Sequence, residues 1–207
     1  EVKADIAKSS AGEQTLVGPV LVVPYVEEYT ETTTDNGIKK TELKREQYQA
    51  VLMPDQLVLE GGFNTEYKKR GIYKALSYQL GGKIKGSFNL PANIKLTAHH
   101  NNSSLSMQPA FLSMGISDPR GITSRPSIVW ANQPLIFKQG TQLKALGNGI
   151  HAAVGLLQQG EDRRIDFEMG LRLRGTEQFH FAPIAGNNSI ALQSNWQHPH
   201  FGVSFLP

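Results

Sequence analysis

Residues 164–174 of this 207-residue chain read RIDFEMGLRLR, a stretch in which apolar and polar side chains alternate. The five apolar residues from Ile165 to Leu173 occupy every second position, and the positions between them are charged except for Gly170. A two-residue period sustained over eleven positions predicts a long antiparallel strand with one buried and one solvated face. The fold is therefore expected to be built from β-strands.

Turn and strand signals continue in both directions from this stretch. The mostly apolar run 16–26 contains Pro19 and Pro24, which predict an edge or bulged strand rather than a regular central one. Asp35-Asn36-Gly37 predicts a hairpin turn, because Asn and Gly accept positive φ at low cost. A second turn is expected at Pro54-Asp55.

Glycine pairs and polar runs divide the remaining sequence. Gly81-Gly82 predicts a turn between two pairing strands, Asn101–Met107 is expected to be a loop, and Gly175-Thr176 is expected to turn the chain. The remaining expected strands are Gln47–Met53, Gly71–Leu80, Lys83–Leu90, Ile94–His99, Ala110–Ile116, Glu177–Phe181 and Ser189–Trp196.

These patterns predict a mainly β fold with hairpin and meander connections. The apolar faces would be buried in an antiparallel β-sandwich or in one large curved sheet. A weak apolar stripe in Glu1–Ala11 predicts a short N-terminal helix, and Gly12 can end it. We expect one β domain over residues 14–207, preceded by a helical segment over residues 1–13.

Composition excludes several classes of protein. The chain has 21 basic and 18 acidic side chains, and this net charge of +3 is too small to indicate a nucleic-acid partner. The absence of cysteine excludes a disulfide framework, thiolate catalysis and Cys-ligated zinc. No apolar run approaches the roughly 20 residues that a membrane-spanning helix needs. The chain ends on Phe205-Leu206-Pro207, and this apolar ending suggests a piece of a longer protein.

Asp118 and Arg120 are the first candidate site residues. They lie in the run Ser117–Gly121, where Asp before Pro favours a turn and Gly121 allows a tight exit. The pair could bind a ligand or gate a site. Alternatively, the carboxylate accepts backbone N–H groups and the guanidinium holds the loop, and turn chemistry favours this structural interpretation.

Trp196 and His198 are the other candidates, both in the aromatic run that ends the chain. His198 and His200 would share one face of a strand, but no third ligand is fixed by the spacing, so we expect no metal. Trp196 could line an apolar ligand groove, but core packing is the favoured interpretation, because aromatic side chains dominate β cores. No nucleophile or dinucleotide motif appears in a suitable context, so neither a catalytic residue nor a cofactor is predicted.

Five blocks in order resemble the extracytoplasmic domain of the CreD family, inner-membrane proteins of Gram-negative bacteria linked to cell envelope integrity. The blocks are GEQTLVGP with LVVPY in residues 12–25, GIY in residues 71–73 with Ala75 and Tyr78, GISDPRGI in 115–122, LRLRG in 171–175, and NWQHPHFG with FLP in 195–207. The resemblance spans essentially the whole chain.

This resemblance implies a periplasmic domain between an N-terminal transmembrane helix and a C-terminal bundle of transmembrane helices. Residues 1–13 would then be the juxtamembrane segment. Its expected partners are its own transmembrane helices and the inner membrane, with a periplasmic protein or a lipid as a further partner. The implied role is non-catalytic, in envelope integrity and envelope stress tolerance.

Two other functions remain open at this stage. A lipid- or cell-wall-fragment-binding module accessory to transport predicts an apolar cavity lined by Phe167, Leu171, Phe179 or Trp196. A scaffold predicts that these side chains fill a closed core. A metal-dependent hydrolase predicts that His198, His200 and a carboxylate converge on one metal ion.

Overall fold

The computed structural model describes residues 11–70 and 72–195 of the chain. The described strands are β1 (Gln14–Asp35), β2 (Ile38–Leu52), β3 (Gln56–Arg70), β4 (Tyr73–Leu90), β5 (Ser104–Met107), β6 (Ala110–Ile116), β7 (Ser127–Trp130), β8 (Gln133–Gln139), β9 (Gly149–Gly155), β10 (Arg163–Thr176), β11 (Phe179–Phe181) and β12 (Asn187–Ser194). Two short 3-10 helices, η1 (Pro119–Gly121) and η2 (Lys144–Leu146), lie between them. The helix expected in Glu1–Ala11 lies outside the described residues, apart from Ala11, which is not helical.

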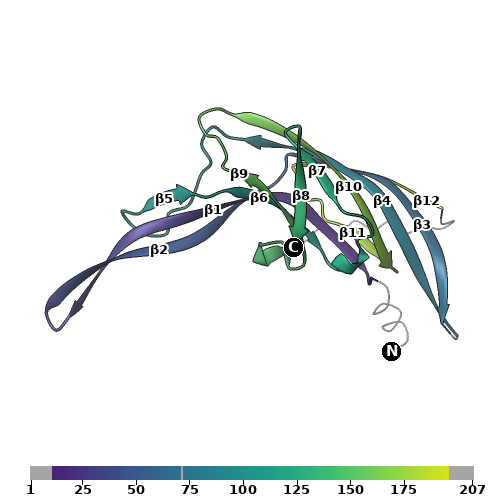
Figure 1. The fold of residues 1–207 in the computed structure, drawn as a ribbon, viewed down its shortest axis with the longest axis horizontal. Helices are drawn as coiled ribbons and strands as arrows, with labels where there is room; N and C mark the ends of the chain where they lie inside the picture. Colours follow the sequence, from purple (N-terminus) through teal and green to yellow (C-terminus); the bar gives the residue numbers. More distant parts are fainter. Residues whose placement is uncertain (1–10, 71, 196–207) are drawn as a thin grey trace.

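The strands form one 12-stranded sheet that curves strongly (Figure 1). Its order is β11-β1-β6-β9-β8-β7-β10-β4-β3-β12, and β2 and β5 pair with β1 in addition. Of the two predicted architectures, the large curved sheet is the one present. The sheet is mixed, because β11 pairs with β1 and β12 pairs with β3 in parallel. The expected return of Glu177–Phe181 along the preceding strand is therefore wrong.

β10 confirms the alternating pattern on which the fold prediction depended. Phe167, Met169, Leu171 and Leu173 are buried, and the residues between them are exposed. The strand pairs along its whole length with β4 on one side, and its residues 167–170 pair with β7 on the other side. It is a central strand, so its apolar face lies in the middle of the core.

The curvature lets both halves of the sheet contribute to one hydrophobic core. Leu16 and Leu21 of β1 belong to the same buried cluster as Leu57 of β3 and Ile84 of β4. Phe88 of β4 lies in this cluster with its ring 5.4 Å from that of Trp130 and 5.6 Å from that of Phe167. Burial of aromatic rings at these separations supplies much of the stability of such a core.

β1 is a central strand with an irregularity, not an edge strand. Its residues 21 and 22 pair with β2 on one side and with β6 on the other. The register with β6 shifts between Val17 and Val20, around Pro19. The bulge was therefore predicted correctly, whereas the edge position was wrong. The turn after β1 is confirmed, with Asn36 and Gly37 at φ of 48° and 80°.

The turn expected at Gly81-Gly82 does not exist, because these glycines lie inside β4. Gly81 and Gly82 pair with Gly62 and Gly61 of β3, so four glycines face one another across two strands. A Cβ on Gly61 would lie 2.3 Å from the carbonyl oxygen of Gly81. The glycines therefore allow the backbones of β3 and β4 to approach closely. A Gly-Gly pair in the sequence is compatible with such an approach and with a turn, and does not distinguish the two.

Residues 91–107 also differ from the expectation. Ile94–His99 forms no strand, whereas Ser104–Met107, part of the expected loop, forms β5 and pairs with residues 25–28 of β1. The backbone N–H groups of His99 and His100 donate to the carboxylate of Glu27 instead of to a neighbouring strand. A buried side chain thus replaces the ladder that the local sequence pattern predicted.

Candidate functional site

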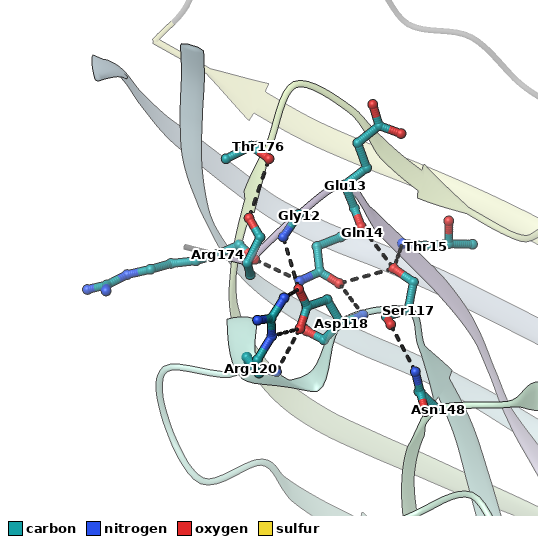
Figure 2. Close-up of polar contacts among 11 residues, drawn as sticks. Gly12, Glu13, Gln14, Thr15, Ser117, Asp118, Arg120, Asn148, Arg174 and Thr176 are labelled. Carbon is teal, nitrogen blue, oxygen red and sulfur yellow. Dashed lines mark hydrogen bonds and ion pairs between the residues drawn. The ribbon is translucent and has the colours of Figure 1, made fainter. Parts of the chain in front are cut away.

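The loop between β6 and β7 brings Asp118 and Arg120 together at the start of η1 (Figure 2). The backbone N–H of Arg120 donates to Oδ1 of Asp118 over 3.2 Å, which caps the short helix. The Arg120 guanidinium donates twice, from Nε to Oδ1 over 2.8 Å and from Nη2 to Oδ2 over 2.7 Å. This two-pronged geometry is the strong form of an Arg–carboxylate pair.

Asp118 also holds the segment that leads into β1. The backbone N–H of Gly12 donates to Oδ2 of Asp118 over 3.0 Å. Ser117 adds two contacts, because its hydroxyl donates to the carbonyl of Glu13 and accepts from the N–H of Thr15. The loop and the beginning of β1 are therefore tied together along four consecutive residues.

Gln14 occupies the centre of this arrangement and is fully buried. Its Nε2 donates to the carbonyl oxygens of Asp118 and Arg174, each over 2.9 Å. Its Oε1 accepts from the backbone N–H of Asp118 over 3.2 Å. A buried amide with these partners joins β1, the loop and the end of β10. We call Gly12, Gln14, Ser117, Asp118 and Arg120 the N-terminal clamp.

The close packing of the clamp requires glycine at position 121. A Cβ there would lie 2.3 Å from the Arg174 carbonyl oxygen and 2.4 Å from Nε2 of Gln14. The loop and β10 also pair at Ile122, which forms a β-bridge with Leu173. Gly121 therefore provides the tight turn that the sequence predicts, and it also lets the loop pack directly against β10.

The electrostatics of the clamp favour the ionised carboxylate. The hydrogen bonds from the Arg120 guanidinium lower the pKa of Asp118 from its ordinary 3.8 to about 2, despite the opposing effect of burial. The Asp118 side chain is 15% exposed and that of Arg120 is 65% exposed. Asp118 therefore stays charged at neutral pH with its oxygens occupied, while the guanidinium borders solvent.

An open groove of about 690 Å³ lies beside the clamp. Its lining combines the clamp loop with β8 and β9 and comprises Ser117, Asp118, Pro119, Arg120, Ile122, Pro126, Phe137, Lys138, Gln139, Asn148 and Ile150. Arg120 and Lys138 supply positive charge, and Gln139 and Asn148 supply amide groups. The lining therefore combines polar and charged side chains with apolar ones such as Ile122, Phe137 and Ile150.

The other residues singled out from the sequence either lie away from the clamp or fall outside the described residues. Trp196 and His198 lie outside the described residues, as does His200. Phe167 and Leu171 are buried in the main core. Phe179 lies edge-on to the rings of Phe63 and Tyr78, with centroids 5.3 Å and 6.3 Å away. In the part of the chain that the structure describes, these three side chains pack in or against the core and do not line the groove.

The four histidines within residues 11–195 form no metal-binding group: His99 and His100 are adjacent, and His151 and His180 lie on β9 and β11. His151 contacts the carbonyl oxygen of Gly140 over 2.6 Å, and His180 contacts the side chain of Gln178. Across the described ranges, no three histidine, aspartate or glutamate side chains come together in a way that could hold a metal ion.

Sequence reasoning missed a second buried carboxylate, Glu27 of β1. Its side chain has no exposed surface and accepts from the N–H groups of His99 and His100 at 3.0 and 2.8 Å and from the Ser103 hydroxyl. Burial opposes its ionisation, but these hydrogen bonds outweigh burial and lower the pKa of Glu27 to about 2. Its position on the apolar face of β1, two residues after buried Tyr25, was the available signal.

Aromatic stacking completes this second cluster. The Tyr29 ring stacks on His100 with centroids 3.5 Å apart, and Tyr48 stacks on His99 at 4.0 Å. Both tyrosine hydroxyls donate to the carboxylate of Glu46. The Glu27 cluster, formed by Glu27, Tyr29, Tyr48, His99, His100 and Ser103, thus fixes the point where the β1–β2 hairpin leaves the core.

The family model described as inner membrane protein CreD matches residues 1–207, the whole chain. The chain belongs to the CreD family. Inner membrane protein CreD of Escherichia coli strain K12 is 29% identical over 209 residues, and the match covers 100% of this chain and 44% of that relative. The chain therefore spans less than half the length of this CreD relative.

Comparison with one solved secretin structure does not show a shared fold. The secretin domain β-barrel of InvG from the Salmonella SPI-1 injectisome is 7% identical, with 78% of this chain and 60% of that chain covered, at a TM-score of 0.10. A score this low does not indicate a common fold. Across residues 11–70 and 72–195, no helix is long and apolar enough to cross a membrane.

Proposed function

We propose that the chain is a non-catalytic periplasmic domain of a CreD-family inner membrane protein with several transmembrane helices. It acts in cell envelope integrity and envelope stress tolerance, through contacts with other proteins or with the envelope. The match of all 207 residues to the CreD family carries this proposal. The filled core and the internally bonded Asp118 support a structural role for the candidate residues.

Cysteine labelling of the whole protein in cells tests the periplasmic location. The chain contains no cysteine, so Thr34→Cys at the exposed end of the β1–β2 hairpin adds a single reporter to it. We expect a membrane-impermeant maleimide to label this variant in intact cells. The unsubstituted protein is the background control. Labelling that appears only after the inner membrane is permeabilised would place the domain in the cytoplasm and refute the proposal.

A deletion strain tests the link to the envelope. Cells without the protein are expected to grow less well under detergent or other envelope stress, and the full-length protein should restore growth. Unchanged growth of the deletion strain under every such stress would contradict the proposed role.

The groove beside the clamp favours a second candidate, a module that binds a lipid headgroup or a cell-wall fragment and assists transport. Arg120 and Lys138 would face the ligand. Native mass spectrometry of the full-length protein extracted from membranes tests this function. A ligand mass that co-purifies with the unsubstituted protein and is lost in the Lys138→Glu variant would support this second function. A spectrum that shows the protein without any bound ligand would support the scaffold role instead.

A further inference from the structure

The end of the β3–β4 hairpin concentrates the positive charge of the chain. Residues 66–74 read EYKKRGIYK and hold four basic side chains and one acidic one. Their net charge of +3 equals the formal net charge of the whole chain, so the rest of the sequence is balanced. We call Tyr67, Lys68, Lys69, Ile72 and Lys74 the basic tip.

Apolar and amphipathic side chains are exposed among these cations. Ile72 is 93% exposed and Tyr67 is 51% exposed, although neither contributes to the core. The Lys74 ammonium lies 3.7 Å from the centroid of the Tyr67 ring. A tyrosine covered by a lysine, and an exposed isoleucine at the turn of the same hairpin, are side chains that favour the boundary between water and lipid headgroups.

The charge arrangement does not serve the stability of the hairpin. Lys69 and Lys74 are direct cross-strand partners, and like charges in this position repel. The carboxylate in this stretch, Glu66, reaches Lys68 at 3.7 Å. An anionic surface would remove this repulsion, because each cation would gain a counter-charge.

The position of the tip suits a contact with the membrane. The Gly12 carbonyl accepts from Thr176, which pairs with Ser77, so the described chain begins beside the base of this hairpin. From Leu76 the hairpin extends four more residues to Ile72, roughly 13 Å at the rise of a β-strand. The hairpin projects on the side of the molecule opposite to the end of β1–β2 (Figure 1).

We propose that the basic tip docks on an anionic phospholipid bilayer, with Ile72 entering the headgroup layer and the lysines contacting phosphates. The inference rests on the proposed location of the chain beside the inner membrane. Attraction between a cluster of lysines and an anionic surface weakens with salt, and the single exposed isoleucine limits the depth of insertion.

Co-sedimentation of the chain with lipid vesicles tests the proposal. The 207-residue chain is mixed with vesicles that contain phosphatidylglycerol, and with vesicles of phosphatidylcholine alone. We expect binding to the anionic vesicles that is lost at high salt. The double variant Lys68→Gln with Lys69→Gln is expected to weaken binding to the anionic vesicles roughly tenfold or more, because each lysine near such a surface adds to the binding free energy. Ile72→Ser is expected to weaken it less.

The other hairpin provides a matched control. Lys39→Gln with Lys40→Gln removes the same charge beside Ile38, which is 72% exposed at the end of β1–β2. We expect this variant to bind like the unsubstituted chain, and thermal melts by circular dichroism establish that all variants fold. Equal losses in both double variants, or no binding of the unsubstituted chain, would overturn the proposal.

The vesicle and labelling experiments fail independently. Periplasmic labelling of Thr34→Cys without vesicle binding would remove the docking inference and leave the proposed function. Tip-dependent vesicle binding with cytoplasmic labelling would retain the docking surface and overturn the proposed periplasmic location.

Discussion

The two long hairpins of this sheet differ in what supports them. β3–β4 lies between β12 and β10, and Leu57, Leu59, Leu80 and Ile84 from it are buried in the core. In β1–β2, residues 29–44, which we call the arm, pair only with each other. Their side chains are mostly exposed, and the arm projects from the body of the sheet (Figure 1).

The charges of the two hairpins follow this difference. Residues 31–44 of the arm hold three acidic and three basic side chains, and Lys44 lies within 4 Å of both Glu31 and Glu42. The arm therefore neutralises itself, whereas the basic tip does not. A two-stranded ribbon without a core is marginally stable alone, so the arm depends on ladder bonds and on the Glu27 cluster. A long hairpin can thus be either a core element or an exposed projection.

The largest effect is expected where β3 and β4 approach each other. Gly61→Ala would place a Cβ 2.3 Å from the Gly81 carbonyl oxygen, and the flanking strands leave no room to separate. We expect the free energy of unfolding to fall by about 3 kcal/mol, measured by urea denaturation. Gly81→Ala is the control, because a Cβ there meets nothing within 4 Å. Equal losses in both variants would mean that close approach is not the reason for these glycines.

A smaller global effect is expected at the start of β1. Asp118→Ala removes the acceptor for Gly12 and Arg120, and we expect a loss of about 2 kcal/mol in the free energy of unfolding. Asp166→Ala is the matched control, because Asp166 also pairs with an arginine two residues away but its side chain is 73% exposed. That change should stay within about 0.5 kcal/mol. If Asp118→Ala instead keeps full stability and loses the envelope phenotype, Asp118 serves binding.

Acid titration sharpens the same prediction. The pKa of Asp118 is lower in the folded chain, about 2, than its ordinary 3.8. Its contribution to stability is therefore complete above about pH 4 and is lost as the pH falls toward 2. In Asp118→Ala this part of the acid dependence should disappear, whereas in Asp166→Ala it should remain.

The most local effect is expected at the base of the arm. Glu27→Gln removes the charge that accepts the N–H groups of His99 and His100, and we expect hydrogen exchange at these two amides to accelerate more than at the amides of β10. Glu28→Gln, which affects only the exposed pair with Arg45, is the control. Unchanged exchange in Glu27→Gln would show that the arm is held by its ladder alone.

Alternating sequence patterns predicted the parts of the fold that are governed by neighbouring residues. The burial of Phe167 to Leu173 and the turn at Asn36-Gly37 follow from local periodicity and local backbone preference. The clamp was predicted as a turn around Asp118, but Gln14 as its centre was not. Its partners Asp118 and Arg174 lie 104 and 160 residues away along the chain.

The wrong predictions have the same origin in long-range pairing. Gly81-Gly82 was interpreted as a turn because its partners Gly61 and Gly62 are not recognisable from the dipeptide itself. Ile94–His99 has the local composition of a strand but forms none, and the His99 amide donates to a carboxylate from β1. Trp196 and His198 remain predictions, because they lie outside the described residues.

β1 is a single 22-residue strand that runs from the clamp to the end of the arm, roughly 70 Å if fully extended. The hydrogen bonds to β6 and β2 lie across its direction, so a lengthwise pull on the arm loads many of them at once. A pull on the tip of the arm would therefore be carried along β1 to Gly12, because these hydrogen bonds resist it together and not one after another. A load on the arm would therefore be felt at the clamp, at the other end of the same strand.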